Sequence, residues 1–177
     1  ICSPTACRTT RFVGAAQAVG RKPNAGTDRC REISTAEQGK MSGMKLIALQ
    51  SGSNGNCFYV ESGGVRLLFD AGIAGVQAQR RLAARGQDVR EIDAMLISHE
   101  HADHVKCAGI YHRKFGLPIH ITSKTLRAAR ARHELGQLGK ICHFQSGSTL
   151  QFGSVSVETI PTAHDGTDGV AFVVDDG

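Results

Sequence analysis

From residue 44 onward the chain alternates short apolar runs with turns rich in Gly, Ser and Asn, a pattern typical of strands. Strands are predicted over residues 45–50, 57–61 and 65–69, and Gly63-Gly64 marks a tight turn between the last two. Short connections favour antiparallel pairing, so these strands should form a meander. A helix is predicted over 75–85, with Val76, Leu82 and Ala83 on one imperfect apolar stripe.

The remainder of the chain mixes helical and extended patterns. A strand is predicted over 94–98, a helix over 108–115, a strand over 118–122, and a helix that Ser123 caps and that runs to about His133. Further strands are predicted over 141–144, 149–152, 155–160 and 170–174. Strands with interspersed helices indicate an α/β layered domain.

Residues 1–43 lack this patterning, and we expect them to be a disordered or non-native leader to a domain over 44–177. They contain no apolar run long enough for a secretory signal or a membrane span. Residues 1–40 hold 7 Lys+Arg against 3 Asp+Glu, leaving 14 against 13 in the rest. The net charge of +5 and the pI near 9.0 therefore give no evidence of a basic binding face on the domain.

The end of the chain also carries an expectation. The strand over 170–174 runs into Asp175-Asp176-Gly177, which reads as the turn of a hairpin. We therefore expect the domain to be incomplete at its C-terminus. The six cysteines show no Cys-x-x-Cys spacing, so reduced thiols in a cytoplasmic protein are expected, with Cys57, Cys107 and Cys142 as small core residues.

The chemistry concentrates in the run His99-Glu100-His101-Ala102-Asp103-His104, directly after the apolar strand over 94–98. Three imidazoles and a carboxylate crowded at a strand end need partners, and a divalent metal ion would satisfy them. A strand sends His99 and His101 to one face, while a turn after Ala102 lets Asp103 and His104 reach a second point. The spacing therefore favours two neighbouring ions.

The motif and its surroundings resemble the metallo-β-lactamase superfamily from about residue 44 to residue 177. The resemblance includes Asp70 at the end of a strand and an isolated His164. Three further stretches, Ser51-Gly52-Ser53-Asn54-Gly55-Asn56-Cys57, Leu67-Leu68-Phe69-Asp70-Ala71-Gly72 and Ile160-Pro161-Thr162-Ala163-His164-Asp165, are most similar to the WalJ/YycJ-type bacterial branch. The resemblance implies a four-layer αββα sandwich, of which only the N-terminal part is present here.

The resemblance also implies roles for individual residues. His99, His101 and His164 would bind a first metal, and Asp103 and His104, the catalytic pair, would contribute to a second. Asp70 and Asp165 would orient the ligands. Two zinc ions are expected in an intact domain, with manganese or iron as alternatives. In intact relatives a later aspartate and histidine complete the second site, and neither has a counterpart here, so that position should be weakened or empty.

Other readings of these residues stay open. His164 could be a solvent-facing histidine, and Asp70 or Asp165 could serve only a local turn. The loop from Ser51 to Asn56 could cradle phosphate, although a simple turn is the commoner role. Basic side chains recur every third residue along the helix after Ser123, which suits either a nucleic-acid backbone or a solvated helix face: Lys124, Arg127 and Arg130.

The function expected from the resemblance is that of a metal-dependent phosphodiesterase or nuclease. A metal-bound hydroxide would attack phosphorus while the ions neutralise developing charge. DNA or another phosphodiester is the expected substrate, no membrane partner is expected, and the oligomeric state is left unassigned. The alternatives are a thioester or lactam hydrolase of the same fold, or an inactive metal-binding fragment that lacks the later ligands.

Overall fold

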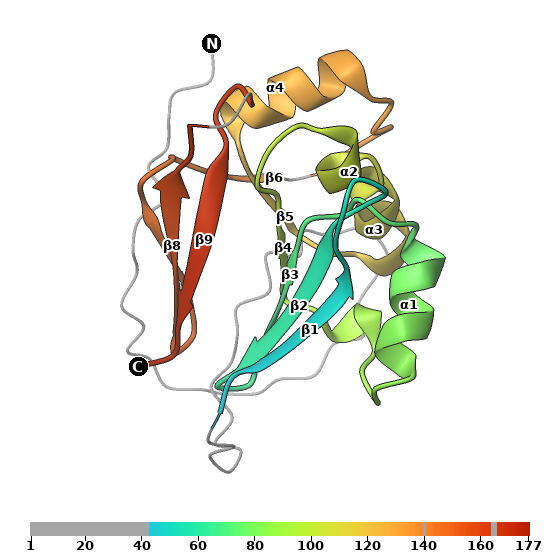
Figure 1. The fold of residues 1–177 in the computed structure, drawn as a ribbon, viewed down its shortest axis with the longest axis vertical. Coiled ribbons are helices and arrows are strands. Elements are labelled where there is room, and N and C mark those ends of the chain that lie inside the picture. The colour runs from blue at the N-terminus through green and yellow to red at the C-terminus, as the bar shows by residue number, and fades with distance from the viewer. Residues whose placement is uncertain (1–42, 140, 164–165) are drawn as a thin grey trace, which may run out of the picture.

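The structure is a computed structural model that describes residues 43–139, 141–163 and 166–177. Figure 1 shows the arrangement of its elements. Nearly all of the expected leader lies outside the described residues, and so do two of the predicted site residues, His164 and Asp165.

A six-stranded mixed sheet forms the centre of the fold, with its strands in sequence order. The strands are β1 (Lys45–Gln50), β2 (Cys57–Ser62), β3 (Val65–Phe69), β4 (Ala94–Leu96), β5 (Ile119–Thr122) and β6 (Ile141–Phe144). The first three pair antiparallel, as the predicted meander requires. From β3 to β6 the pairs are parallel, because helical segments return the chain to the same edge between successive strands.

Helices cover one face of this sheet (Figure 1). They are α1 (Gly75–Ala83), the short 3-10 helix η1 (Val89–Glu91), α2 (Ala102–Val105), α3 (Ala108–Phe115) and α4 (Ser123–Arg132). The core between helices and sheet joins Leu68 and Met95 of the strands to Leu82 and Tyr111 of the helices, all fully buried. Burial of such side chains, about 1.5–3 kcal/mol each, holds the helices on the sheet.

The start of α4 differs from the sequence prediction. Thr122, and not Ser123, is the capping residue, because the Thr122 side chain accepts a hydrogen bond from the amide of Thr125 at 3.1 Å. Thr122 is buried at the end of β5, so strand and helix follow each other without a loop. The basic side chains of Lys124, Arg127 and Arg130 are exposed on the outer face of α4, as a solvated helix face requires.

A second, three-stranded antiparallel sheet packs on the other face of the large sheet (Figure 1). Its strands are β7 (Thr149–Phe152), β8 (Val155–Pro161) and β9 (Val170–Asp175). The core between the two sheets contains Leu67 and Leu96 from the large sheet and Phe152 and Val157 from the small one. Alternate residues of β3 and β4 therefore face opposite cores, since side chains alternate across a strand.

The described residues form three layers, helices, sheet and sheet, which are part of the expected αββα sandwich. On the outer face of the small sheet Ile160 and Val173 are exposed. Cys57 is buried in the helix-facing core and Cys107 packs against it, as expected, whereas Cys142 on β6 is half-buried and is not part of that core. Among the described segments no helix has the length and apolarity needed to cross a membrane.

Candidate metal centre

The predicted motif lies just beyond the carboxyl end of β4, where polar side chains can gather without interrupting a sheet. Strand pairing of β4 ends at Leu96, and α2 begins at Ala102 with His101 as its capping residue. The ring of His99 lies 4.7 Å from that of His101 and 4.0 Å from that of His104, measured between ring centroids. The turn between β4 and α2 thus brings the three imidazoles of the motif together.

Asp70 holds the ring of His104 from behind. Its Oδ2 lies 2.7 Å from His104 Nδ1, and the same carboxylate accepts hydrogen bonds from the amide and hydroxyl of Ser98 at 2.8 and 2.9 Å. A carboxylate beside Nδ1 requires a proton on that nitrogen. The tautomer this assigns leaves a lone pair on His104 Nε2, the state needed for binding a cation.

Ser98 extends this network to His99. Its hydroxyl donates to Asp70, so the lone pairs of its oxygen remain to accept the Nδ1–H of His99, at 2.9 Å. That arrangement leaves His99 Nε2 as an acceptor too. One buried carboxylate, acting directly and through a serine, therefore sets the tautomers of two of the predicted ligands.

The pKa of the His104 imidazole is raised above its ordinary value. Burial opposes the charged form, but the hydrogen bond and charge of Asp70, together with the charge of Asp103, outweigh burial. His104 Nε2 lies 3.3 Å from Asp103 Oδ2. The negative charge gathered here attracts a proton, and it would attract a metal cation for the same reason.

Asn56 bridges the two residues predicted for the second metal. Its side-chain amide donates to Asp103 Oδ2 and to His104 Nε2, each at 3.0 Å. Its carbonyl oxygen accepts the amide of Gly52, which fixes the orientation of the group. The loop from Ser51 to Asn56 thus holds the second pair of predicted ligands, besides making a turn.

Three loops interlock beneath these side chains. The amide of Asn56 donates to the carbonyl of Asp103 at 2.6 Å, and the amide of Gly72 donates to the carbonyl of Asn56 at 3.0 Å. The amide of Ala71 donates to the carbonyl of His104 at 2.7 Å. A Cβ atom on Gly72 would lie only 1.6 Å from the Asp103 carbonyl oxygen, so no side chain fits there. Gly72 therefore lets the loop after β3 approach α2.

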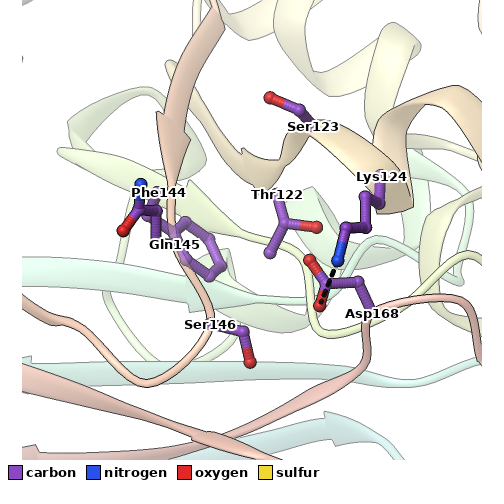
Figure 2. A pocket seen from close by; sticks show the side chains of 7 residues that line it. All are labelled: Thr122, Ser123, Lys124, Phe144, Gln145, Ser146 and Asp168. Atoms are coloured by element: carbon purple, nitrogen blue, oxygen red, sulfur yellow. Dashed lines mark ion pairs between the residues drawn. The ribbon is translucent and has the colours of Figure 1, made fainter.

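A hollow of about 380 Å³ lies near the site, at the start of α4 (Figure 2). Its lining residues are Thr122, Ser123, Lys124, Phe144, Gln145, Ser146 and Asp168. The Lys124 ammonium lies 3.9 Å from a carboxylate oxygen of Asp168, as Figure 2 shows. This pairing balances the positive charge of Lys124, so the hollow does not present a net cationic surface to a phosphate.

The structure thus brings together five of the predicted site residues: Asp70, His99, His101, Asp103 and His104. Among the described residues, no three His, Cys, Asp or Glu side chains form a complete metal-binding group. His164, the third imidazole predicted for the first ion, and Asp165 lie outside those residues. The donor types of the gathered side chains suit a divalent cation, with imidazole nitrogens on one side and a mixed oxygen and nitrogen pair on the other.

Sequence reasoning missed three residues of this neighbourhood: Asn56, Ser98 and Glu100. Ser98 and Glu100 are the sequence neighbours of His99. Their position beside a predicted ligand could have identified them as candidate supporting residues. Asn56 lies in the loop considered for phosphate binding from the sequence, but its contact with Asp103, 47 residues away, left no local signal.

Comparison with known proteins agrees with the family expected from the sequence. A family model described as the metallo-beta-lactamase superfamily matches residues 51–177. The exodeoxyribonuclease WalJ of Streptococcus pneumoniae strain D39 is 36% identical over 125 residues, which are 70% of this chain and 46% of that protein. The exodeoxyribonuclease YycJ of Bacillus anthracis is 32% identical over 125 residues, 70% and 47% respectively. The chain spans about half the length of the curated relatives it matches.

Solved structures share the fold at low sequence identity. A metallo-beta-lactamase with a HARLDQ motif from Cronobacter sakazakii superposes with a TM-score of 0.62 at 16% identity, covering 73% of this chain and 54% of that one. The metallo-beta-lactamase fold protein YhfI of Bacillus subtilis has a TM-score of 0.58 at 20% identity, covering 76% and 58%.

Proposed function

Because this chain belongs to the metallo-β-lactamase superfamily, we propose that it is part of a metal-dependent phosphodiesterase that acts on DNA as an exonuclease. The two curated relatives named above, both called exodeoxyribonucleases, support this substrate class. The superfamily generally binds divalent metal ions. This chain spans about half the length of those two relatives. The exonuclease activity is therefore proposed for a whole protein of which this chain is a part.

The observation that carries the proposal is the network from Asp70 through Ser98 to His99 and His104. It gives both imidazoles the tautomer that carries the proton on Nδ1 and a lone pair on Nε2, which is the form that binds a cation. We propose that His99 and His101 bind a first ion together with His164, and that Asp103 and His104 contribute to a second. Zinc is the proposed metal, since imidazole-rich sites favour it.

When bound, such ions would act as Lewis acids that activate water and neutralise charge on the phosphoryl group. The protein's own residues supply the arrangement. Asp70 orients His104, and Asn56 keeps the carboxylate of Asp103 next to that ring. Because these supports are hydrogen-bonded to the backbone of three separate loops, the groups need little reorganisation on binding. We propose Asp103 and His104 as the residues that face the reacting phosphate.

The test combines metal binding with cleavage. The purified protein is dialysed against chelator, and Zn²⁺ or Mn²⁺ is added back during assays with end-labelled duplex DNA and with bis(p-nitrophenyl) phosphate. Cleavage should need the metal and should fall by at least about 100-fold in His99→Ala and His104→Ala. His143→Ala, which replaces an exposed imidazole on β6, serves as the matched control and should keep activity.

The outcomes separate the alternatives. Nitrocefin and S-lactoylglutathione, a lactam and a thioester, are assayed beside the phosphodiesters, and turnover of either one in place of DNA would refute the proposed substrate class. Metal binding without cleavage of any substrate would identify a metal-binding part that needs further residues for catalysis. Absence of metal binding would overturn the proposal as a whole.

A further inference from the structure

Glu100 stands between two predicted ligands, His99 and His101, yet its side chain belongs to a different set of contacts. The residue is fully buried, with 0% of its surface exposed. A buried carboxylate is costly unless hydrogen bonds and opposite charge compensate for lost water. Its partners therefore show what the group is for.

The main partner is Thr167. The Thr167 amide lies 2.9 and 3.1 Å from the two carboxylate oxygens of Glu100, and the Thr167 hydroxyl donates to Oε1 at 2.8 Å. Thr167 lies three positions after His164 in the chain. The Glu100 side chain thus holds the segment that follows His164, the ligand predicted from a distant part of the chain.

Neighbouring contacts strengthen this attachment. The amide of Val170 donates to the carbonyl of Ser98 at 3.1 Å, so the residue on the other side of His99 holds the same segment. A Cβ atom on Gly166 would lie 3.3 Å from both Glu100 Oε2 and His99 Cβ, and one on Gly169 would lie 3.6 Å from His99 Cβ. The segment therefore lies directly against His99 and Glu100 of the motif.

Glu100 also joins the motif to the end of α4. Arg132 Nη1 lies 3.2 Å from Glu100 Oε1, and the ring of His133 lies 2.9 Å from the Glu100 carbonyl oxygen. The Arg132 side chain is half exposed, so water weakens this ion pair and the Thr167 hydrogen bonds carry most of the attachment.

The hydrogen bonds of Glu100 also bear on whether it could bind the metal itself. Both oxygens are already engaged by Thr167 and Arg132, so it is poorly placed to be a ligand itself.

We propose that Glu100 is a positioning residue for the metal centre, which sets the segment 166–170 against the strand end that carries His99 and His101. The inference rests on the proposed metal-dependent function. Its consequence is that the carboxylate of Glu100 governs how the imidazoles before and after it in the chain converge on one cation, without binding that cation. A purely structural carboxylate would stabilise the fold and leave the geometry of a bound metal unchanged.

The test uses cobalt as a spectroscopic probe in the whole chain. Glu100→Gln keeps the size of the side chain and removes its charge, and Thr167→Ala removes one donor. Glu158→Gln, an exposed carboxylate on β8, is the matched control. For each protein we would measure Zn²⁺ affinity by competition with a chromophoric chelator, the visible d–d spectrum with saturating Co²⁺, and unfolding in urea without metal.

We expect Glu100→Gln to bind Zn²⁺ at least about 10-fold more weakly and to shift the Co²⁺ spectrum, under conditions where it is folded. Thr167→Ala should give a smaller change in the same direction, and Thr167→Ser, which keeps the hydroxyl, should restore the wild-type spectrum. Glu158→Gln should match the wild type. If Glu100→Gln does not fold, the contrast between Thr167→Ala and Thr167→Ser decides the question.

Unchanged affinity and spectrum with only a lower unfolding free energy would overturn the positioning role and leave the proposed function standing. Failure of the wild type to bind Zn²⁺ or Co²⁺ would overturn both proposals. Weakened metal binding in Glu100→Gln would support the positioning role whether or not the wild type cleaves DNA, so the two proposals can fail separately.

Discussion

Asp70 Oδ2 lies 2.7 Å from Nδ1 of His104, a residue 34 positions later in the chain. Asp70 is buried, and it is the single non-glycine residue with positive φ in the described part of the chain, at 63°. That backbone conformation costs an ordinary residue roughly 1 kcal/mol and is tolerated best by glycine, Asn and Asp. The chain accepts this cost at the position where a carboxylate reaches the metal motif, a pattern common at functional sites.

Replacing Asp70 by Asn should therefore separate the effect of the carboxylate charge from the effect of the strained backbone at this position. Asn tolerates positive φ, so Asp70→Asn should fold, but the neutral amide no longer fixes the proton on His104 Nδ1. We expect Zn²⁺ affinity to fall by about 10- to 100-fold, measured by isothermal titration. Asp93→Asn, which changes a carboxylate that accepts the Arg66 amide away from the motif, is the control and should keep its affinity. Equal affinities for the two variants would contradict the orienting role of Asp70.

Gly72→Ala should disturb the site through sterics alone. The added methyl group would meet the Asp103 carbonyl oxygen at 1.6 Å and the Asn56 amide nitrogen at 2.7 Å, both backbone atoms that cannot turn aside. We expect a loss of several kcal/mol in the free energy of unfolding in urea, comparable to severe overpacking.

Gly116→Ala provides the comparison for Gly72→Ala. Gly116 has φ of 75° and no atom within 4 Å of an added Cβ, so only backbone strain of about 1 kcal/mol is expected. Similar losses for the two variants would mean that the loop after β3 is not held tightly against α2.

Asn56→Ala should weaken the support of Asp103 and His104. It removes hydrogen bonds to both side chains and to Gly52, and leaves the half-buried acceptors on Asp103 and His104 without this donor. We expect the free energy of unfolding to fall by about 1–3 kcal/mol. The exposed neighbour Asn54, changed to Ala, should stay within about 0.5 kcal/mol of the wild type. A stability change no larger than that of Asn54→Ala would show that these contacts add nothing to the fold.

His120 should make stability depend on pH. Burial in β5, where its ring packs against Phe152, lowers the pKa of the imidazole to about 4. In the unfolded chain the pKa is about 6.5, so between these values the unfolded state binds more protons. The stabilising contribution is complete above about pH 6.5 and is lost as the pH falls through 4, by at most about 1.4 kcal/mol per pH unit.

The measurement for His120 is urea unfolding from pH 7 to pH 4, with His120→Gln as the non-titrating comparison. On acidification the free energy of unfolding should fall further in the wild type than in His120→Gln. The difference in unfolding free energy between the two proteins should therefore narrow. Carboxylates titrate equally in both proteins and cancel in the difference. Parallel stability curves would show that His120 does not titrate differently in the folded and unfolded states.

Most elements of the fold could be predicted from the sequence because their signals are local. The strands at 45–50, 65–69 and 141–144 have the predicted bounds, as does the helix at 108–115, since apolar alternation and flanking glycines act within a few residues. The strand predicted over 94–98 forms ladder pairs only to Leu96. Its apolar run continues to Ile97, but the neighbouring strand β5 determines where pairing stops.

Periodicity could not determine how these elements assemble. The parallel order of β3 to β6 and the division into two sheets depend on which apolar faces meet, and both faces of β3 and β4 are apolar. The meander and the α/β class followed from short connections and alternating helices. The layered sandwich came from the family resemblance.

The sequence by itself determined the candidate metal ligands, because His99, His101, Asp103 and His104 are neighbours in one run and their donor chemistry is a property of the side chains. The tertiary structure alone decided which residues support them. Asp70, Asn56 and Thr167 reach the motif from positions 34, 47 and 67 residues away from their partners. Such contacts arise only when packing of the two cores brings loops together, and no local pattern records that distance.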